Sequence, residues 1–203
     1  AIQTKSDRIL RDVDLLDEIN KTAKCVVEMT LTTYDDTLCA LLEPNVCNTK
    51  RRVEVLETMR QRGIPTVVWL TPILPFINDT AENIRGILDG CVRAGVHAIL
   101  CFGMGVTLRS GDREYFYASL DRHFPGIKER YIRAFGDRYE VASPRNAELM
   151  RLLVDEKGVD FDAAFDIARA TISYTNHTVM PEALEKWPIS TLRSLLPRTY
   201  MFI

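Results

Sequence analysis

The side chains with the most distinctive chemistry in this chain of 203 residues are its five cysteines. Zinc and iron–sulfur sites are typically held by closely spaced cysteines, but no C-x-x-C pair occurs here. The number of cysteines is odd and their spacing is wide: Cys25, Cys39, Cys47, Cys91 and Cys101. This pattern predicts reduced thiols in a cytoplasmic protein, without a metal site or an iron–sulfur cluster. We expect Cys39 and Cys47 to be small, buried or half-buried apolar residues.

Polar or flexible residues follow two of the apolar runs of the chain. Asn78 and Asp79 come shortly after the run that ends at Ile73, and they form either a helix N-cap region with Thr80 or a pair of substrate-binding side chains. Gly103-x-Gly105 follows the next apolar run but lacks the remaining spacing of a dinucleotide-binding motif. It therefore predicts a tight turn rather than a phosphate site.

Three apolar, β-branched runs predict the strands that position these residues, at 25–31, 64–73 and 96–102. Each run is too short for a free-standing helix and too continuous for a strand with one wet face, so we expect strands buried on both faces of a parallel sheet. Helical patterns at 9–19, 53–59 and 84–91 flank or separate the runs, and the last two stop at Gly63 and Gly95. Strands that alternate with helices predict an α/β fold with right-handed crossovers.

Residues 112–140 combine aromatic and basic side chains, which is also the composition of single-stranded nucleic-acid sites. The alternative is a pair of amphipathic helices whose aromatic side chains pack on the sheet. Residues 1–147 hold 20 acidic and 20 basic residues, and this balance favours the helices. From residue 148 onward only helical patterns remain.

The overall composition sets limits on partners. A formal net charge of −2 gives no general attraction to polyanions, so nucleic acid is not supported as a partner. No apolar run of membrane-spanning length and no secretory signal is present, which favours a cytoplasmic protein that does not bind membranes. Binding of a small molecule is compatible with the composition.

Several motifs in the first part of the chain occur in the order of a known family. They are Thr4-Lys5-Ser6 with Ile9-Leu10-Arg11-Asp12, Thr32-Thr33 with Asp35, Leu42-Glu43-Pro44-Asn45, Pro72-Ile73-Leu74-Pro75 with Ile77-Asn78-Asp79, and Phe102-Gly103-Met104-Gly105. Over residues 1–149 this pattern resembles the radical S-adenosylmethionine proteins related to spore photoproduct lyase. The resemblance implies part of a (β/α) barrel, with ligand groups at the carboxyl ends of parallel strands.

The resemblance also implies which residues bind ligands. Lys5, Ser6, Thr30 and Thr32 would contribute to an S-adenosylmethionine site, in which the lysine pairs with a carboxylate and hydroxyl groups bind the ribose or the amino group. The alternative is a solvated lysine and threonines that merely suit a strand. Asn78 and Asp79 would lie at the mouth of the barrel and touch substrate. The cluster motif C-x-x-x-C-x-x-C of this family is absent, so we expect no cleavage of S-adenosylmethionine.

The last part of the chain resembles a second family. The string Tyr174-Thr175-Asn176-His177-Thr178-Val179-Met180-Pro181-Glu182-Ala183-Leu184-Glu185-Lys186-Trp187-Pro188 is similar to the glycogen and maltodextrin phosphorylases, which split α-1,4-glucan with phosphate and pyridoxal phosphate. By this resemblance His177 lines a glucose site, with Asn176 beside it, and a neutral imidazole exchanges hydrogen bonds with a sugar hydroxyl. The alternative is a turn at a helix end. The family's cofactor-binding lysine motif is absent, so we expect no pyridoxal phosphate.

The two resemblances meet inside one helical stretch, between residues 147 and 153. We therefore expect a composite fragment, with a partial barrel over 1–149, an all-helical segment over 150–203, no catalytic residue and neither activity. A segment as small as the second buries too little surface to be stable alone. We expect self-association through unpaired strand edges and exposed apolar helices.

Overall fold

The computed structural model of the chain describes residues 1–155. The chain divides into two compact units, Ala1–Gly158 and Val159–Ile203, so the described residues all belong to the first unit. The predicted boundary between residues 149 and 150 therefore falls inside that unit. No helix among the described residues is long and apolar enough to cross a membrane.

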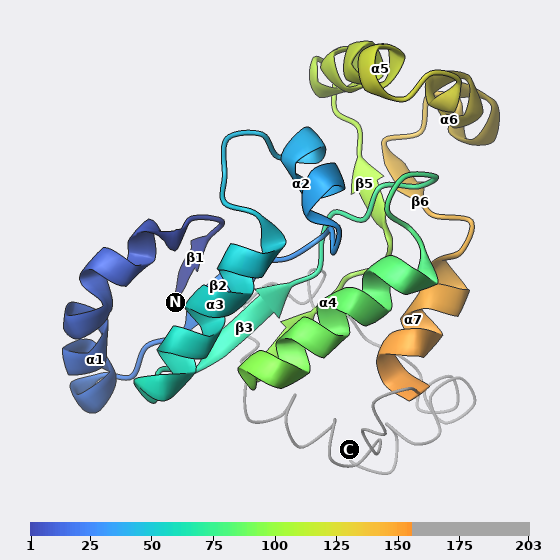
Figure 1. Ribbon diagram of the computed structural model, residues 1–203. Coiled ribbons are helices and arrows are strands. Elements are labelled where there is room, and N and C mark those ends of the chain that lie inside the picture. The colour runs from blue at the N-terminus through green and yellow to red at the C-terminus, as the bar shows by residue number, and fades with distance from the viewer. Residues whose placement is uncertain (156–203) are drawn as a thin grey trace, which may run out of the picture. The chain divides into compact units, whose positions relative to one another are not determined.

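A sheet of parallel strands forms the centre of the unit, in the order β1 (Ile2–Thr4), β2 (Val27–Thr30), β3 (Thr66–Trp69) and β4 (Ala98–Leu100) (Figure 1). The register aligns Met29 with Val68, and Val68 with Ile99. The three strands predicted from apolar runs are confirmed, as is the α/β class. β1 was not predicted from a run, because its three residues are too few to give a periodic pattern.

Helices pack against this sheet and connect its strands. They are the 3-10 helix η1 (Asp7–Asp12) followed by α1 (Val13–Thr22), then α2 (Asp36–Leu42), α3 (Thr49–Gln61) and α4 (Ala81–Ala94). Asn48 caps α3 by accepting a hydrogen bond from the Arg51 amide, and Thr80 caps α4 in the same way through Asn83. α4 ends at Gly95, whose φ of 62° lies in the left-handed region that suits glycine.

The expectation that the strands are buried on both faces is wrong for β3 and β4. Thr66 and Val68 of β3 are buried, whereas Val67 and Trp69 on the opposite face are only half-buried, and every residue of β4 is half-buried. Side chains alternate between the faces of a strand, so one face of β3 packs in the core. α3 and α4 lie over the sheet on the side turned to the viewer in Figure 1.

A second apolar cluster lies apart from the parallel sheet, at the top of Figure 1. It is formed by α5 (Asp112–His123), α6 (Ile127–Phe135) and an antiparallel pair of strands, β5 (Gly105–Thr107) and β6 (Glu140–Ala142). The two predicted helices are confirmed. Their aromatic side chains do not pack on the sheet as expected. Tyr131 instead meets the rings of Phe76, Phe116 and Phe135 edge-on, and Phe135 stacks on Phe76.

The last described element is α7 (Asn146–Asp155), which packs against α4. Leu149 on this helix is fully buried in the main core. The helix runs across the stretch in which the two sequence resemblances meet. A composite origin of the chain stays a prediction, and the predicted helical segment over 150–203 lies almost wholly outside the described residues.

Candidate functional site

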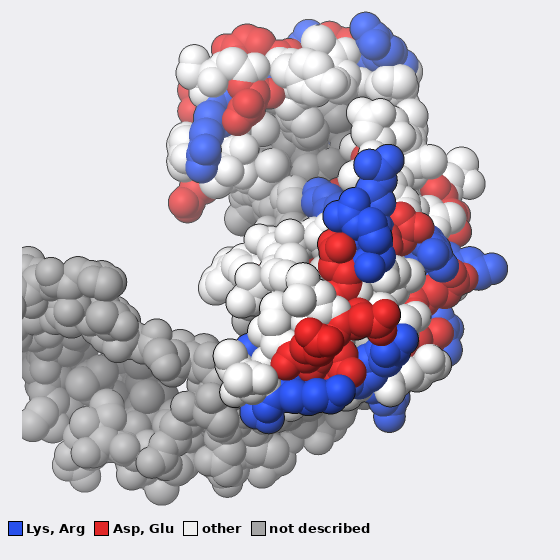
Figure 2. Space-filling model, turned by 90° about the vertical axis from the view of Figure 1, so that its left-hand side faces the viewer, with Lys and Arg blue, Asp and Glu red and all other residues white. Residues whose placement is uncertain are grey.

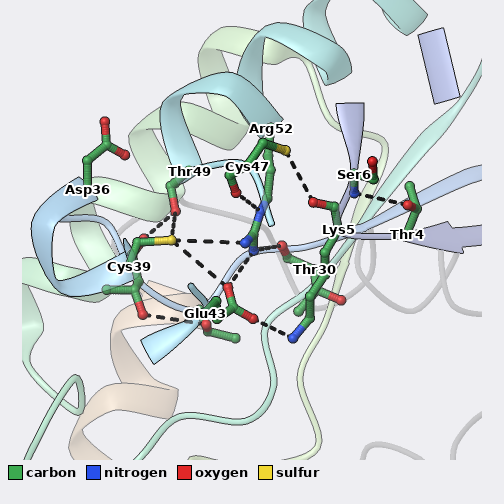
Figure 3. A network of polar contacts seen from close by, with 12 residues as sticks. Thr4, Lys5, Ser6, Thr30, Asp36, Cys39, Glu43, Cys47, Thr49 and Arg52 are labelled. Atoms are coloured by element: carbon green, nitrogen blue, oxygen red, sulfur yellow. Dashed lines mark hydrogen bonds and ion pairs between the residues drawn. The ribbon is translucent and has the colours of Figure 1, made fainter. Parts of the chain in front are cut away.

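Lys5, which follows β1, and Thr30, the last residue of β2, belong to a network of polar contacts around the carboxylate of Glu43 (Figure 3). The ammonium group of Lys5 forms an ion pair and hydrogen bond with Oε1 of Glu43, and 39% of the lysine side chain is exposed. Ser6 caps η1, because its Oγ accepts a hydrogen bond from the Arg8 amide at 3.2 Å. The Ser6 amide in turn donates to Oγ1 of Thr4. Lys5 is thus neither a free solvated lysine nor an unpaired cation.

The centre of this network is the fully buried guanidinium group of Arg52 on α3. Its Nη1 lies 2.7 Å from Oε2 of Glu43 and donates to the carbonyl oxygen of Thr30 at 3.0 Å, while Nε donates to the carbonyl oxygen of Cys47 at 2.8 Å. Glu43 therefore balances two cations, Lys5 and Arg52. The carboxylate of an S-adenosylmethionine molecule bound at Lys5 would have to compete with Glu43 for the ammonium group.

Two cysteines border the network, and both are free thiols, as are the other three of the chain. Cys39 is buried, as expected, and its Sγ accepts from Oγ1 of Thr49 at 3.6 Å. Cys47 is half-buried, and its thiol donates to the carbonyl oxygen of Lys5 at 3.2 Å. Within residues 1–155, no group of histidine, cysteine and acidic side chains is arranged to hold a metal ion. Both thiols take part in packing and local hydrogen bonds.

Thr32 and Asn78 lie in a second buried network, behind the end of β2. The carbonyl oxygen of Thr32 accepts hydrogen bonds at 2.9 Å from the side-chain amides of both Asn78 and Asn83. Oδ1 of Asn78 accepts from the Leu74 amide at 2.6 Å, and Oδ1 of Asn83 accepts from the Tyr34 amide at the same distance. These asparagines hold the loops after β2 and β3 together.

Asp79 is also buried, and it links the start of α4 to the segment before α7. The Ser143 hydroxyl donates to Oδ2 of Asp79 at 2.5 Å, and Nη1 of Arg145 donates to the Asp79 carbonyl oxygen at 3.1 Å. Asn78 and Asp79 precede the helix, whereas the N-cap itself is Thr80. Their predicted contact with substrate stays a prediction, and in the described residues their polar groups serve the fold.

Sequence reasoning missed the partners in these networks, above all Arg52. One signal was present: Arg52 lies among Thr49, Val53 and Leu56, at the helical spacing of the buried face of α3. An arginine on such a face predicts a buried cation with an acidic partner. The partner, Glu43, has no comparable signal in the sequence.

Burial has electrostatic consequences at two groups away from these networks. It raises the pKa of the half-buried Cys101 thiol, so this cysteine stays protonated at neutral pH. It also raises the pKa of the Tyr131 phenol in the second apolar cluster, where the Asp79 carboxylate acts in the same direction. Within residues 1–155, the buried hydroxyl groups of Tyr131 and Tyr117 have no hydrogen-bond partner.

A pocket of about 520 Å³ lies beyond the carboxyl ends of β3 and β4. Thr71 and Pro72 follow β3, Phe102 and Gly103 follow β4, and the β5–β6 pair completes the wall. None of the six described residues that were predicted to bind a ligand lines this pocket. Asn176 and His177 lie outside the described residues.

Comparison with known proteins finds similarity for the end of the chain. The sequence profile of the carbohydrate phosphorylase family matches residues 143–203. The brain form of glycogen phosphorylase from Rattus norvegicus and that from Homo sapiens are each 61% identical to the chain over 51 residues. Glycogen phosphorylase of Bacillus subtilis is 57% identical over 56 residues. The similarity to phosphorylases predicted from the string around His177 is confirmed.

The aligned residues are a small part both of this chain and of the relatives. They include 25% of this chain for the brain forms and 28% for the Bacillus protein, but only 6% and 7% of those proteins' own lengths. No solved structure matches the chain. The family match does not reach residues 1–142, so the resemblance of that part to radical S-adenosylmethionine proteins stays a prediction.

Proposed function

We propose that residues 143–203 derive from an α-glucan phosphorylase and carry a piece of its sugar-binding region. The observation that carries the proposal is the identity of more than half of the aligned residues to glycogen phosphorylases over 51 to 56 residues. His177 and Asn176 lie within the matched residues, and His177 has the chemistry to exchange hydrogen bonds with a glucose hydroxyl.

The isolated chain is not a phosphorylase in this proposal. The matched part is a small fraction of any relative, whereas catalysis needs substrate, phosphate and cofactor held in one fixed geometry. Of the described lysines, Lys5, Lys21 and Lys128 are bound to carboxylates, and no lysine is among the described residues of the pocket beyond β3 and β4. We therefore assign the chain no catalytic residue.

The first unit has a structural role in this proposal. Its polar side chains at the strand ends bind one another, and the described residues offer no metal site. Binding of S-adenosylmethionine at Lys5 and Thr30 is a weaker second candidate, because it rests on sequence motifs and needs the ion pair of Lys5 with Glu43 to open.

The decisive experiment is an assay for glucose 1-phosphate formed from maltoheptaose and inorganic phosphate, in the presence of pyridoxal phosphate. We expect no product from the 203-residue chain, while a full-length glycogen phosphorylase serves as the positive control. Borohydride reduction after incubation with pyridoxal phosphate should label no lysine in stoichiometric amounts. Turnover, or one equivalent of reduced cofactor on the chain, would show that the chain is an enzyme and would overturn the proposal.

The glucan-binding half of the proposal has its own readout. Saturation-transfer NMR with maltose should show contact with the chain, and His177→Ala should weaken it more than His123→Ala, a change on α5 outside the matched residues. If the two variants behave alike, His177 does not bind sugar in this chain.

A further inference from the structure

The pocket beyond β3 and β4 has the place and the size of a ligand site. Its volume of about 520 Å³ lies within the ~300–1,000 Å³ that small-molecule pockets span. It lies at the carboxyl ends of parallel strands, which is where α/β sheets bind ligands on topological grounds. None of the predicted ligand-binding residues within 1–155 lines it.

The β5–β6 pair forms part of the wall of the pocket, with small residues at one end and polar residues at the other. Gly105 faces Ala142 in the register, and Thr107 faces Glu140. Alternation along a strand places these four residues on one face, opposite Val106 and Val141, which pack in the second apolar cluster. Gly105 lies close against the partner strand, because a Cβ atom at this position would come within 2.3 Å of the Val141 carbonyl oxygen.

An exposed aromatic ring forms part of the wall. The side chain of Phe102 directly follows β4 and is 78% exposed, although its ring centroid lies only 5.7 Å from that of Trp69. Exposure of a large apolar ring beside a pocket costs free energy that packing elsewhere would recover. A ligand with an apolar face gives this ring a partner.

Some of the polar groups that line the pocket are available to a ligand, unlike those of the networks around Glu43 and Asp79. Within residues 1–155, the carboxylate of Glu140 and the hydroxyl of Thr107 have no hydrogen-bond or ion-pair partner. Oδ1 of Asn146 accepts a hydrogen bond from the Met104 amide at 2.7 Å, which fixes the side chain and leaves its amide group as a donor. The pocket therefore offers an aromatic face, an anionic acceptor and an amide donor.

We propose that this pocket binds a neutral mono- or disaccharide. The C–H face of a pyranose ring packs on Phe102, its hydroxyl groups donate to Glu140, and the amide of Asn146 donates to a ring or hydroxyl oxygen. Glu140 is the one charged residue among the described residues of the lining, so sugar phosphates and sugar acids are disfavoured. The inference does not rest on the proposed phosphorylase origin, because Phe102 and Glu140 precede the matched residues.

Matched variants test the site in the full 203-residue chain. Binding of glucose and maltose is measured by saturation-transfer NMR and by calorimetric titration, with dissociation constants expected in the millimolar range. Phe102→Ala should weaken binding about tenfold, the scale of one well-placed aromatic contact. Tyr115→Ala is the control, because Tyr115 on α5 is also 78% exposed and does not line the pocket. Circular dichroism confirms that both variants fold.

Charge selectivity gives a second, independent arm. Glucuronate should bind at least several-fold more weakly than glucose, and Glu140→Gln should reduce that difference, because the amide no longer repels the sugar carboxylate. Three results would overturn the inference: no binding of either neutral sugar, binding that Phe102→Ala leaves unchanged, or equal affinity for glucose and glucuronate. Binding that is lost in His177→Ala but kept in Phe102→Ala would also overturn it, while it would support the phosphorylase-derived sugar site.

Discussion

The buried ion pair between Arg52 and Glu43 makes a sharp prediction about stability. Arg52→Met keeps much of the side-chain volume but removes the charge, the ion pair at 2.7 Å, and the hydrogen bonds to the carbonyl oxygens of Thr30 and Cys47. Lys5→Met removes the other cation that faces Glu43. The two substitutions thus take a cation from the same carboxylate in different surroundings.

The expected magnitudes follow from burial. Arg52 is fully buried, and breaking a buried pair from one side costs about 3–5 kcal/mol, because a charge and hydrogen-bonding groups lose their partners away from water. The Lys5 side chain is 39% exposed, so its pair is worth about 0–1 kcal/mol. At ~2–4 °C per kcal/mol for a chain of this size, Arg52→Met should lower Tm by about 6–20 °C and Lys5→Met by only a few degrees at most.

Urea unfolding followed by tryptophan fluorescence measures the loss in free energy of unfolding of the first unit for each variant. The chain has two tryptophans, so Trp187→Phe leaves Trp69 on β3 as the sole reporter, and both variants are made in that background. The urea dependence of the free energy of unfolding should keep its slope, since the surface exposed on unfolding is nearly unchanged. If Arg52→Met destabilises the protein no more than Lys5→Met does, the buried pair does not hold α3 to the end of β2 and our reasoning is wrong.

Three further substitutions test other parts of the structure. Tyr131→Phe removes a buried hydroxyl without a partner, so it should raise the free energy of unfolding by about 1 kcal/mol, unlike the exposed Tyr115→Phe. Because burial raises the pKa of Tyr131, the phenol ionises more readily in the unfolded chain than in the folded one. The free energy of unfolding should therefore fall as the pH rises above about 10. Tyr131→Phe should reduce that fall in urea titrations at alkaline pH. Gly105→Ala should lower the stability more than Gly63→Ala, because the new methyl group at residue 105 meets a backbone oxygen. At residue 63 the methyl group meets no atom, and only the strain of a positive φ, about 1 kcal/mol, opposes it. Equal melting temperatures of the two variants would contradict this. Asn78→Ala should cost about 2–4 kcal/mol in urea unfolding, since its buried amide bonds the loops after β2 and β3, and a loss below 1 kcal/mol would argue against that role.

The sequence predicted the parts of the fold that carry a strong local pattern. Long apolar runs located β2, β3 and β4, and glycine marked the end of α4 at Gly95. The β5–β6 pair was out of reach, because strands of three residues have almost no periodicity and Gly105 pairs with Ala142 far along the chain. The prediction that both faces of β4 are buried was wrong, because burial depends on which elements cover a strand, and the local sequence does not contain that information.

The candidate sites show the same limit at the level of side chains. Lys5 and Asn78 were correctly placed near strand ends, but sequence does not show that each finds a partner inside the protein, Glu43 for the first and the Thr32 carbonyl for the second. Conversely, Glu140 was not singled out, because an exposed glutamate has no distinguishing neighbours in sequence. Its interest arises from the residues that the fold brings beside it, Phe102 and Asn146.

The start of the phosphorylase-like segment is built into the core of the first unit. Ser143 and Asn146 belong to the matched residues, yet they bind Asp79 and the Met104 amide of the first unit, and Leu149 is fully buried in its core. A helix that packs through one apolar face constrains the type of residue at a few positions and little else. In α7, Leu149 is fully buried and Leu152 and Leu153 are partly buried against the main core, so substitutions at positions that do not contact the core should leave the packing against α4 intact.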